Sequence, residues 1–311
     1  GLVEREGEAR LLLLALVGAE HLLLLGPPGT AKSELCRRLS GLCGLTYFER
    51  TLTRFSTPEE LFGPLSLSAL ERDEFRRVTD GYAPTCELLF LDEVYKSNSA
   101  ILNTLLTLLN ERLFDEGSAR VPVPLLSAVA ASNEGPESDE LAALHDRFLL
   151  RKLVAPVSDD GVLALLLGKA GEEQERQGAG SKGGGAGTDA TDDECSEDLA
   201  EGLRRTLAFV RGGAPSVSLP RWAALLLRDA RSFVRELSAE GIGGGYVSDR
   251  RLRRAADLLK SSAAAHGRKV VSVLDALAVL PHVLWEEPEE AESLSEWVES
   301  QALPEGGAEQ I

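Results

Sequence analysis

Short apolar runs separated by polar turns dominate the first half of the chain. Runs at 22–25, 88–91 and 129–131 are bounded by Gly-rich, acidic or amide-containing turns, and they are short enough to be strands buried on both faces of a sheet. Residues 99–112 carry apolar side chains at helical spacing, which predicts a helix with one wide buried stripe. We therefore predict an α/β core with a parallel sheet over residues 1–156, with strands at 21–25, 46–52, 88–91, 129–133 and 149–154.

Two segments of this core predict inserted β-hairpins. Residues 65–70 and 75–82 alternate loosely on either side of a charged turn. Residues 113–126 contain a second turn, and Pro122 and Pro124 confine its return strand to a sheet edge or a loop. The first hairpin has two open interpretations, because it could contact another molecule or only pack on the surface.

The second half of the chain predicts a helical region over residues 157–285, which is called the lid below. Residues 158–170 begin it, and Gly241–Gly245 form a flexible break between its middle helices. Residues 171–198 are Gly-, Ser- and acid-rich and poor in apolar side chains, so we expect a flexible insertion within the lid. The remaining lid helices are predicted at 199–211, 220–238, 248–266 and 270–285.

Negative charge is concentrated in two segments. The chain has 311 residues and a formal net charge of −17. Residues 172–198 carry nine acidic and two basic side chains, a net −7, and residues 286–311 carry nine acidic side chains and no basic one, a net −9. The rest of the chain is therefore close to neutral, at −1. We expect 286–311 to be a solvated, weakly ordered acidic tail, and this charge disfavours a nucleic-acid partner.

Residues 26–33 carry the strongest chemical signal. They follow an apolar run and precede a helical pattern, so a Gly-rich loop opening a helix would surround a phosphate chain with backbone N–H groups. Lys32 would supply an ammonium for the outer phosphates, and Ser33 a hydroxyl for Mg²⁺. Ala31 replaces the usual glycine before the lysine, and we expect it to keep a right-handed helical backbone. The predicted nucleotide-binding residues are Gly26, Pro27, Pro28, Gly29, Thr30, Ala31, Lys32, Ser33 and Glu34.

An acidic pair, Asp92 and Glu93, follows the apolar run at 88–91. Carboxylates in this position emerge at the carboxyl edge of a parallel sheet, where ligands bind. Asp92 is predicted to hold Mg²⁺ together with Ser33, and Glu93 to polarise a water for attack on the γ-phosphate. Asn133 ends the next buried run and could orient that water without repelling phosphate, or could serve only as a turn asparagine.

Arg147 lies in a polar segment just before the last predicted strand. An arginine fixed at the edge of a domain suits a finger that enters the nucleotide site of a neighbouring subunit. The local sequence taken alone favours a simpler interpretation, a surface arginine paired with Asp146.

The order of phosphate loop, acidic pair, terminal asparagine and arginine resembles that of an AAA+ ATPase. The connecting segments resemble the MoxR family and, within it, the RavA-like branch. The segments that carry this resemblance are Arg54–Pro64, Leu91–Lys96, Ala100–Leu106, Ala131–Glu134 and Asp146–Phe148. The resemblance implies a three-layer α/β core with a parallel sheet and inserted β-hairpins, followed by an α-helical lid.

The resemblance also implies partners and site residues. It implies ATP and Mg²⁺ as cofactors, catalytic roles for Glu93, Asn133 and Arg147, and a homohexameric ring. It further implies chaperone-like remodelling of a protein client and a partner with a von Willebrand factor A domain. A lid arginine of the family, called sensor 2, matches Arg250, with Arg251 as the close alternative; Ser248 would cap their helix. The family's channel-facing hairpin corresponds to 65–82, whose candidate contacts are Phe75, Arg76, Arg77 and Tyr82.

Three other functions stay open at this point. A nucleic-acid motor of the MCM type would need a basic channel hairpin, but Arg72, Arg76 and Arg77 are balanced by Glu71, Asp73 and Glu74. A second open function is that of the ATPase subunit of a metal chelatase, a related kind of protein that also has the inserted hairpin. A scaffold that binds nucleotide without hydrolysis is disfavoured because every expected catalytic group is present.

The remaining composition bears on the compartment. The four cysteines, Cys36, Cys43, Cys86 and Cys195, form no CxxC pair and are expected to be small buried hydrophobes rather than metal ligands, so a cytoplasmic or other reducing compartment is favoured. No apolar run approaches the length of about 20 residues that spans a bilayer. The chain begins at Gly1 and contains no Met, so we expect it to be a piece of a longer protein.

Overall fold

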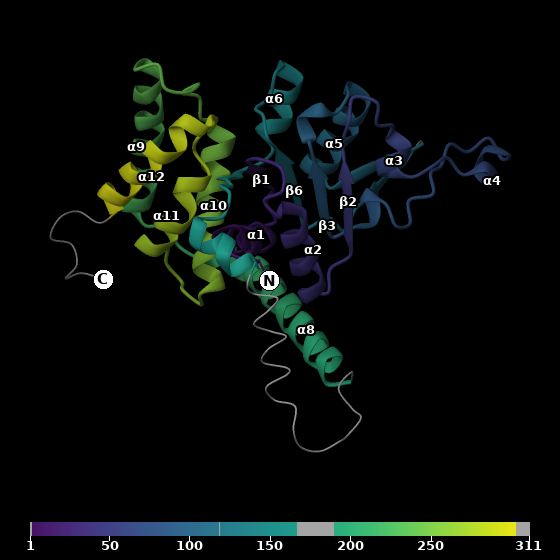
Figure 1. Cartoon of the computed structure of the whole chain (residues 1–311), viewed down its shortest axis with the longest axis horizontal. Helices are drawn as coiled ribbons and strands as arrows, with labels where there is room; N and C mark the ends of the chain where they lie inside the picture. The colour runs from purple at the N-terminus through teal and green to yellow at the C-terminus, as the bar shows by residue number, and fades with distance from the viewer. Residues whose placement is uncertain (1, 118, 167–189, 303–311) are drawn as a thin grey trace.

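A five-stranded parallel sheet forms the centre of the molecule (Figure 1). The computed structural model describes residues 2–117, 119–166 and 190–302. The strand order is β2-β3-β6-β1-β7, and every neighbouring pair is parallel, which confirms the predicted α/β core. The strands are β1 (Leu22–Leu25), β2 (Tyr47–Thr51), β3 (Leu88–Asp92), β6 (Ser127–Ser132) and β7 (Leu150–Leu153).

The register of the sheet brings the strand ends together. Leu25, the last residue of β1, is level with Ser132 at the end of β6, and the N–H of Gly26 donates to the Ser132 carbonyl at 3.0 Å. All four residues of β1 and all six of β6 are buried, as expected for central strands covered on both faces. The carboxyl ends of β1, β3 and β6 therefore form one continuous edge.

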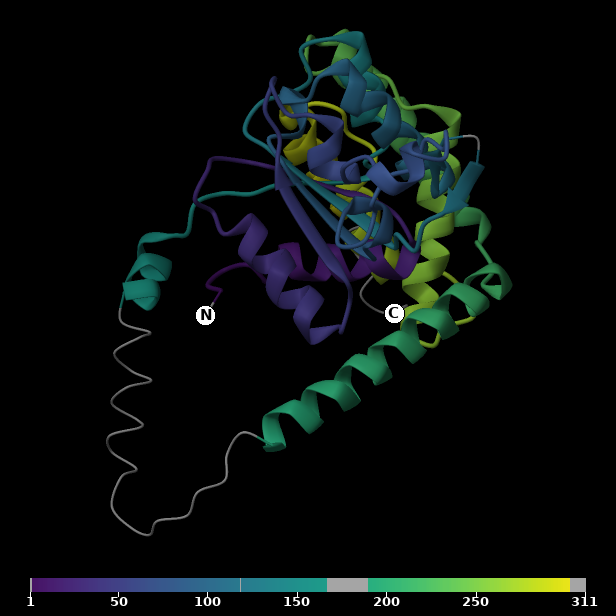
Figure 2. The same ribbon diagram turned by 90° about the vertical axis from the view of Figure 1, so that its right-hand side faces the viewer.

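Helices cover both faces of this sheet. Helices α1 (Glu6–Gly18) and α2 (Lys32–Leu42) pack together on one face, and α5 (Ser99–Glu111) lies on the other (Figure 2). Helix α6 (Asp139–His145) packs beside α5 and leads into β7. The apolar residues at helical spacing in α5 are buried apart from the half-buried Leu106, which confirms the predicted stripe.

The two predicted hairpins have different outcomes. Strands β4 (Leu113–Glu116) and β5 (Ala119–Pro122) pair antiparallel, so the second hairpin is confirmed. The hairpin predicted at 65–82 is wrong, because the chain doubles back through a single bridge between Leu65 and Arg77 and carries the short helix α4 (Leu67–Leu70) between them. The Ser66 hydroxyl accepts from the Ala69 N–H at 3.3 Å, and this cap favours a helical turn over a strand. The other short helix of this region is α3 (Pro58–Phe62).

The lid is a group of helices that packs on α1 through α8 (Ala190–Gly213) and α10 (Asp249–Ala265). Helix α10 contacts α1 directly, and α8 lies beside both. Helices α9 (Arg221–Ala239) and α11 (Val273–Val279) complete the predicted set. Of the predicted insertion, residues 171–189 lie outside the described residues, whereas 190–198 are helical rather than loose because they form the first turns of α8. Within the described residues no helix is both long and apolar enough to cross a bilayer.

The prediction of a weakly ordered acidic tail from 286 is wrong up to residue 302. Helix α12 (Pro288–Ala302) buries Leu294 and Val298 against the lid, and Trp297 stacks on Phe233 with ring centroids 5.1 Å apart. Apolar side chains at helical spacing explain the correction, because they give the acidic segment one buried face. Residues 303–311 lie outside the described residues.

The docking of α12 can be tested by truncating one of its fully buried side chains. Leu294 is fully buried, so Leu294→Ala should lower the free energy of unfolding of the lid by about 2–5 kcal/mol, measured by urea denaturation. The exposed residue Glu296 on the same helix is the control, and Glu296→Ala should change this free energy by no more than about 0.5 kcal/mol. Equal stabilities of the two variants would contradict a docked α12.

Candidate active site

The loop after β1 forms one wall of a cavity of 260 Å³ at the carboxyl edge of the sheet. We call it the phosphate cavity, because the residues predicted to bind phosphate line it. Lys32 and Ser33 enter this cavity from the start of α2, Asp92 and Glu93 from the end of β3, and Asn133 from the end of β6. The structure thus brings together five predicted site residues that are up to a hundred positions apart in the sequence. A second group of the predicted residues contributes to the same wall: Gly26, Pro28, Gly29, Thr30 and Ala31.

Ala31 corrects one prediction. Its φ of 61° and ψ of 26° are left-handed, where we expected a right-handed backbone. The reason is that α2 begins only at Lys32, so the loop must reverse at Ala31, the position where a glycine is usual. A left-handed alanine costs about 1–2 kcal/mol, which the surrounding loop must offset. Gly29 also has a positive φ, of 80°, and as a glycine it adopts it without that cost.

The Lys32 ammonium is held by the loop itself. Its Nζ donates to the carbonyl oxygens of Gly26 at 2.9 Å and Pro27 at 2.8 Å. Burial lowers the pKa of Lys32, while the charges of Asp92 and Glu93 oppose that shift. These contacts keep a positive charge at the phosphate cavity, where the ammonium can exchange loop carbonyls for phosphate oxygens.

Ser33 and Asp92 fit the role of magnesium ligands. Both line the cavity, and a hydroxyl and a carboxylate are the hard oxygen donors that Mg²⁺ prefers. Burial raises the pKa of Asp92, and the nearby Glu93 charge adds to this effect, so a divalent cation would stabilise the ionised form. Within the described part of the chain, no three or more His, Cys, Asp or Glu side chains gather as a metal site. A cation here would therefore share its coordination with phosphate and water.

Glu93 has a constrained conformation. Its φ of 54° places it in the left-handed region just before a 3₁₀ turn, and its N–H donates to Asp92 Oδ1 at 3.1 Å. Its buried Oε2 lies 3.1 Å from Lys96 Nζ, in an ion pair whose geometry leaves that oxygen without a hydrogen bond. Because Glu93 also lines the cavity, its carboxylate can accept a hydrogen bond from a water bound there.

Glu34 and Pro27 do not join the phosphate cavity. The Glu34 carboxylate pairs with Arg37 at 2.9 Å and Arg38 at 2.6 Å on the exposed side of α2. Pro27 lines an adjoining cavity of 320 Å³, which is largely apolar and also bounded by Val3, Val157 and Leu165. Such a neighbouring apolar cavity suits the base of a nucleotide.

Arg5 is a site residue that sequence reasoning missed. Its buried guanidinium donates from Nε to the Thr30 carbonyl at 3.1 Å and from Nη2 to the Ala155 carbonyl at 2.8 Å. It thereby joins the segment before α1 to the phosphate loop and to the chain after β7. No local motif marks it, because its partners lie 25 and 150 residues away.

Arg147 lies at the opposite edge of the sheet. It precedes β7, whose first residue Leu150 is level with Leu22 at the start of β1, whereas the phosphate loop follows the end of β1. A four-residue strand, about 13 Å at 3.3 Å per residue, therefore separates the two places. Arg147 Nη1 donates to Asp146 at 3.2 Å, so the structure does contain the local pair considered above.

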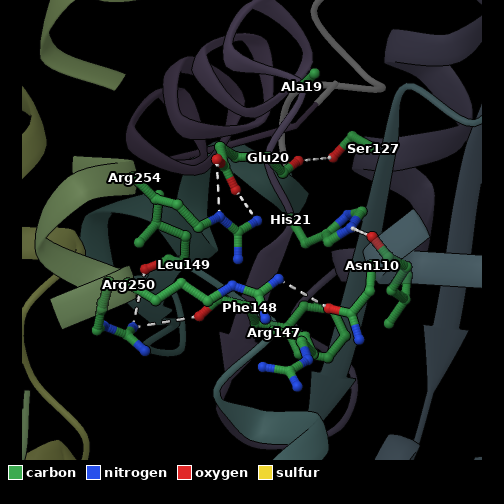
Figure 3. Close-up of polar contacts among 12 residues, drawn as sticks. Ala19, Glu20, His21, Asn110, Ser127, Arg147, Phe148, Leu149, Arg250 and Arg254 are labelled. Atoms are coloured by element: carbon green, nitrogen blue, oxygen red, sulfur yellow. Dashed lines mark hydrogen bonds and ion pairs between the residues drawn. The ribbon is translucent and has the colours of Figure 1, made fainter. Parts of the chain in front are cut away.

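Arg250 lies beside Arg147 at this edge (Figure 3). Arg250 Nη2 donates to the Oδ1 of Asn110, in the last turn of α5, at 3.1 Å. Burial lowers the pKa of Arg147, and the nearby positive charge of Arg250 lowers it further. The neighbouring Arg254 is paired with Glu20, just before β1. Neither Arg147 nor Arg250 is therefore brought to the phosphate cavity of its own chain.

Arg251, the alternative to Arg250, is a buried structural residue. The Ser248 hydroxyl caps α10, as predicted, by accepting a hydrogen bond from the backbone N–H of Arg251 at 3.1 Å. The Arg251 guanidinium donates to the carbonyl oxygens of Phe148, Leu149 and Val283, and only 4% of the residue is exposed. Of the two arginines, Arg250 alone is exposed beside Arg147.

Comparisons with known proteins agree with this geometry. A family model described as the MoxR domain in the MoxR-vWA-beta-propeller ternary systems matches residues 1–183, and a model of an AAA lid domain matches residues 228–298. A crystal structure of a proposed ATPase from Cytophaga hutchinsonii superposes with a TM-score of 0.62 at 19% identity, covering 96% of this chain and 89% of that one. That likeness supports the fold.

Relatives in sequence cover most of the chain. The protein named MJ0812 from Methanocaldococcus jannaschii is 35% identical to this chain, over 93% of this chain and 69% of its own length. The protein named MJ0079 from the same organism is 36% identical, over 92% of this chain and 67% of its own length. The structural protein ORF618 of Acidianus two-tailed virus is 29% identical over 47% of this chain and 24% of its own. Because the MoxR model matches more than half of its residues, and because it has the AAA+ core and lid, the chain belongs to the MoxR family of AAA+ ATPases.

Proposed function

We propose that this protein is a Mg²⁺-dependent ATPase that hydrolyses ATP to ADP and phosphate. The observation that carries the proposal is the single cavity in which Lys32, Ser33, Asp92, Glu93 and Asn133 meet. Magnesium bound there would link the nucleotide's phosphates to the protein and neutralise charge that develops in the transition state. The adjoining apolar cavity gives the adenine base a place next to the phosphate loop.

In this proposal each side chain has a separate task. Lys32 and the loop N–H groups bind the phosphates, while Ser33 and Asp92 hold the metal ion. Glu93 accepts a hydrogen bond from the attacking water and increases its nucleophilicity, and the Asn133 amide fixes the water's direction. In-line attack then needs a positive charge on the far side of the γ-phosphate, and among the described residues that line this cavity Lys32 is the only cation.

We propose that a neighbouring subunit supplies that charge. Arg147 and Arg250 lie together at the edge of the sheet remote from their own phosphate loop, which supports action on the site of the next subunit in a homohexameric ring. Two adjacent cations at one surface repel each other, and the γ-phosphate of a neighbour would relieve that repulsion. Arg147 would act as the arginine finger and Arg250 as the sensor of nucleotide state.

The work done with this energy is proposed to be chaperone-like remodelling of a protein complex. The matched family model, with its MoxR-vWA-beta-propeller systems, supports a partner with a von Willebrand factor A domain. Membership of the RavA-like branch stays a prediction from the connecting segments. A protein client fits better than a nucleic acid, because Arg77 is paired with Glu59 at 3.3 Å and Arg76 lies 3.8 Å from Glu116 in the channel-facing candidate insert.

Removal of the general base should separate binding from hydrolysis. Glu93→Gln keeps the size and polarity of the side chain but loses the charge that polarises water, so turnover should fall roughly 100- to 10,000-fold. Affinity for a fluorescent ATP analogue should stay close to that of the unaltered protein, and ADP should not accumulate. An unchanged rate of phosphate release in the variant would contradict the role of Glu93. If the unaltered protein and the variant both released phosphate equally slowly, the protein would be a scaffold that binds nucleotide without hydrolysing it.

Mixing two inactive variants should restore activity if Arg147 acts between subunits. Arg147→Ala removes the finger and should lower turnover roughly 1000-fold, whereas Glu93→Gln subunits retain a finger. In a mixture, the intact Glu93 sites of the first variant receive Arg147 from the second, so phosphate release should rise above that of either variant alone. Arg228→Ala, on the exposed face of α9, is the matched control and should retain full activity. A mixture as inactive as its components would exclude action in trans.

Single-stranded DNA should leave the ATPase rate unchanged. The paired state of Arg76 and Arg77 provides few free cations for phosphate contacts, so we expect neither tight binding nor stimulation at physiological salt. Phosphate release measured with and without single-stranded DNA checks this expectation. Strong stimulation would favour a nucleic-acid motor of the MCM type over a protein remodeller.

A further inference from the structure

A buried hydrogen-bond chain connects the segment after Glu93 with the turn that carries Arg147. Tyr95 lies two residues beyond Glu93 and is 8% exposed, and its hydroxyl contacts Nδ1 of His145, which is 4% exposed. His145 is the last residue of α6, two positions before Arg147. The opposite ring nitrogen, Nε2, lies 3.1 Å from the carbonyl oxygen of Glu286 in the lid.

The directions of these hydrogen bonds follow from the chemistry of the partners. A backbone carbonyl only accepts, so His145 Nε2 carries the proton and donates to Glu286. Nδ1 is then the free acceptor of a neutral imidazole, and the Tyr95 hydroxyl donates to it. Burial, with the charges of Arg151 and Arg251, lowers the pKa of His145 to about 2, so the ring stays neutral and this arrangement does not change near pH 7.

His145 also fixes the turn at 146–149 through its backbone. Its carbonyl oxygen accepts from the Phe148 N–H at 3.2 Å and from Nη2 of Arg151 at 3.1 Å. The next residue, Asp146, contacts the guanidinium of Arg147. The position of His145 therefore determines the position and direction of the Arg147 side chain.

We propose that Tyr95 is a positioning residue that sets the arginine finger of its own subunit, and so controls hydrolysis in the neighbouring subunit. The inference rests on the proposed function of Arg147. A change of the segment after Glu93, such as that accompanying nucleotide binding, moves the Tyr95 hydroxyl, and His145 transmits this shift to the turn. Each site thereby reports its state to the next site through one side-chain pair.

The test separates the two subunits that share a site. Acceptor subunits carry Arg147→Ala and keep their own Glu93, and donor subunits carry Glu93→Gln and keep Arg147. Only acceptor sites served by a donor finger can hydrolyse ATP. Tyr95→Phe, which removes one hydroxyl and retains the ring, is then placed in the donor alone or in the acceptor alone.

We expect Tyr95→Phe in the donor to lower phosphate release by the mixture roughly tenfold, because a finger displaced by a fraction of an ångström stabilises the transition state less. In the acceptor the same change should leave the rate unaltered. Loss confined to the acceptor would overturn the proposal, because Tyr95 would then support its own Glu93. Equal loss in both would also overturn it, because it would indicate a general structural role.

Two further variants complete the design. Tyr47→Phe removes a hydroxyl that donates to Glu49 at 2.8 Å on β2, outside this chain of contacts, and should have no effect in either subunit. His145→Asn in the donor keeps an oxygen that can accept from Tyr95, so it should retain more activity than the Tyr95→Phe donor; equal or greater loss would overturn the proposal. Assembled rings are isolated by size-exclusion chromatography, and the rate of phosphate release is compared per ring. A mixture of the parent donor and acceptor that stays inactive would refute action in trans itself, whereas an active mixture insensitive to Tyr95→Phe would refute only the relay.

Discussion

The parallel register of the sheet is the constraint on which the rest of this structure depends. Strands that all run in one direction have two chemically different edges, and each edge gathers residues that are distant in sequence. Here the ends of β1, β3 and β6 collect the phosphate loop, the carboxylates and the asparagine, while the starts of β1 and β7 adjoin the arginines. The two sets of residues therefore lie at opposite edges of the sheet, which is the arrangement expected if the proposed sites are shared between copies.

The electrostatics of the phosphate cavity are balanced for a charged ligand. Lys32 is partly buried and satisfied by loop carbonyls, and the carboxyl of Asp92 has a raised pKa because it too is removed from water. Each of these charges is destabilised by its surroundings to some extent. A magnesium–nucleotide complex would supply the opposite charge to both, with phosphate for the ammonium and the cation for the carboxylate. Binding of such a ligand would then offset the cost of holding these charges in place.

The sequence predicted those parts of the site whose chemistry is local. The phosphate loop and the acidic pair are contiguous motifs next to apolar strands, so their residues could be assigned without knowing the fold. The left-handed Ala31 could not be predicted, because its conformation depends on where α2 begins. Arg5 was missed for a related reason, since its role consists of contacts with Thr30 and Ala155 that only the tertiary structure creates.

Composition misled the prediction for one segment, and a loose alternation misled it for another. The acidic segment after residue 286 is rich in Glu, yet Leu294 and Val298 recur at helical spacing and bury one face of α12. At 65–82 the loose alternation suggested strands, although a serine cap stabilised a helical turn instead. In both segments a few residues with specific partners decided the structure, and average properties of the segment did not.

Arg147 and Arg250 are both connected to the segment that follows Glu93. Helix α5 begins at Ser99, shortly after that segment, and its last turn contains Asn110, whose Oδ1 accepts a hydrogen bond from Arg250. At 1.5 Å per residue this 13-residue helix spans about 20 Å, from one edge of the sheet to the other. Tyr95 makes the parallel connection through His145 to the turn of Arg147. A rigid helix and a buried hydrogen bond thus leave from the same few residues and reach the same surface, so a displacement of these residues would move both arginines together. Coupling of this kind requires only that the segment have two positions, one with nucleotide bound and one without, because the connecting elements are too well packed to absorb the difference.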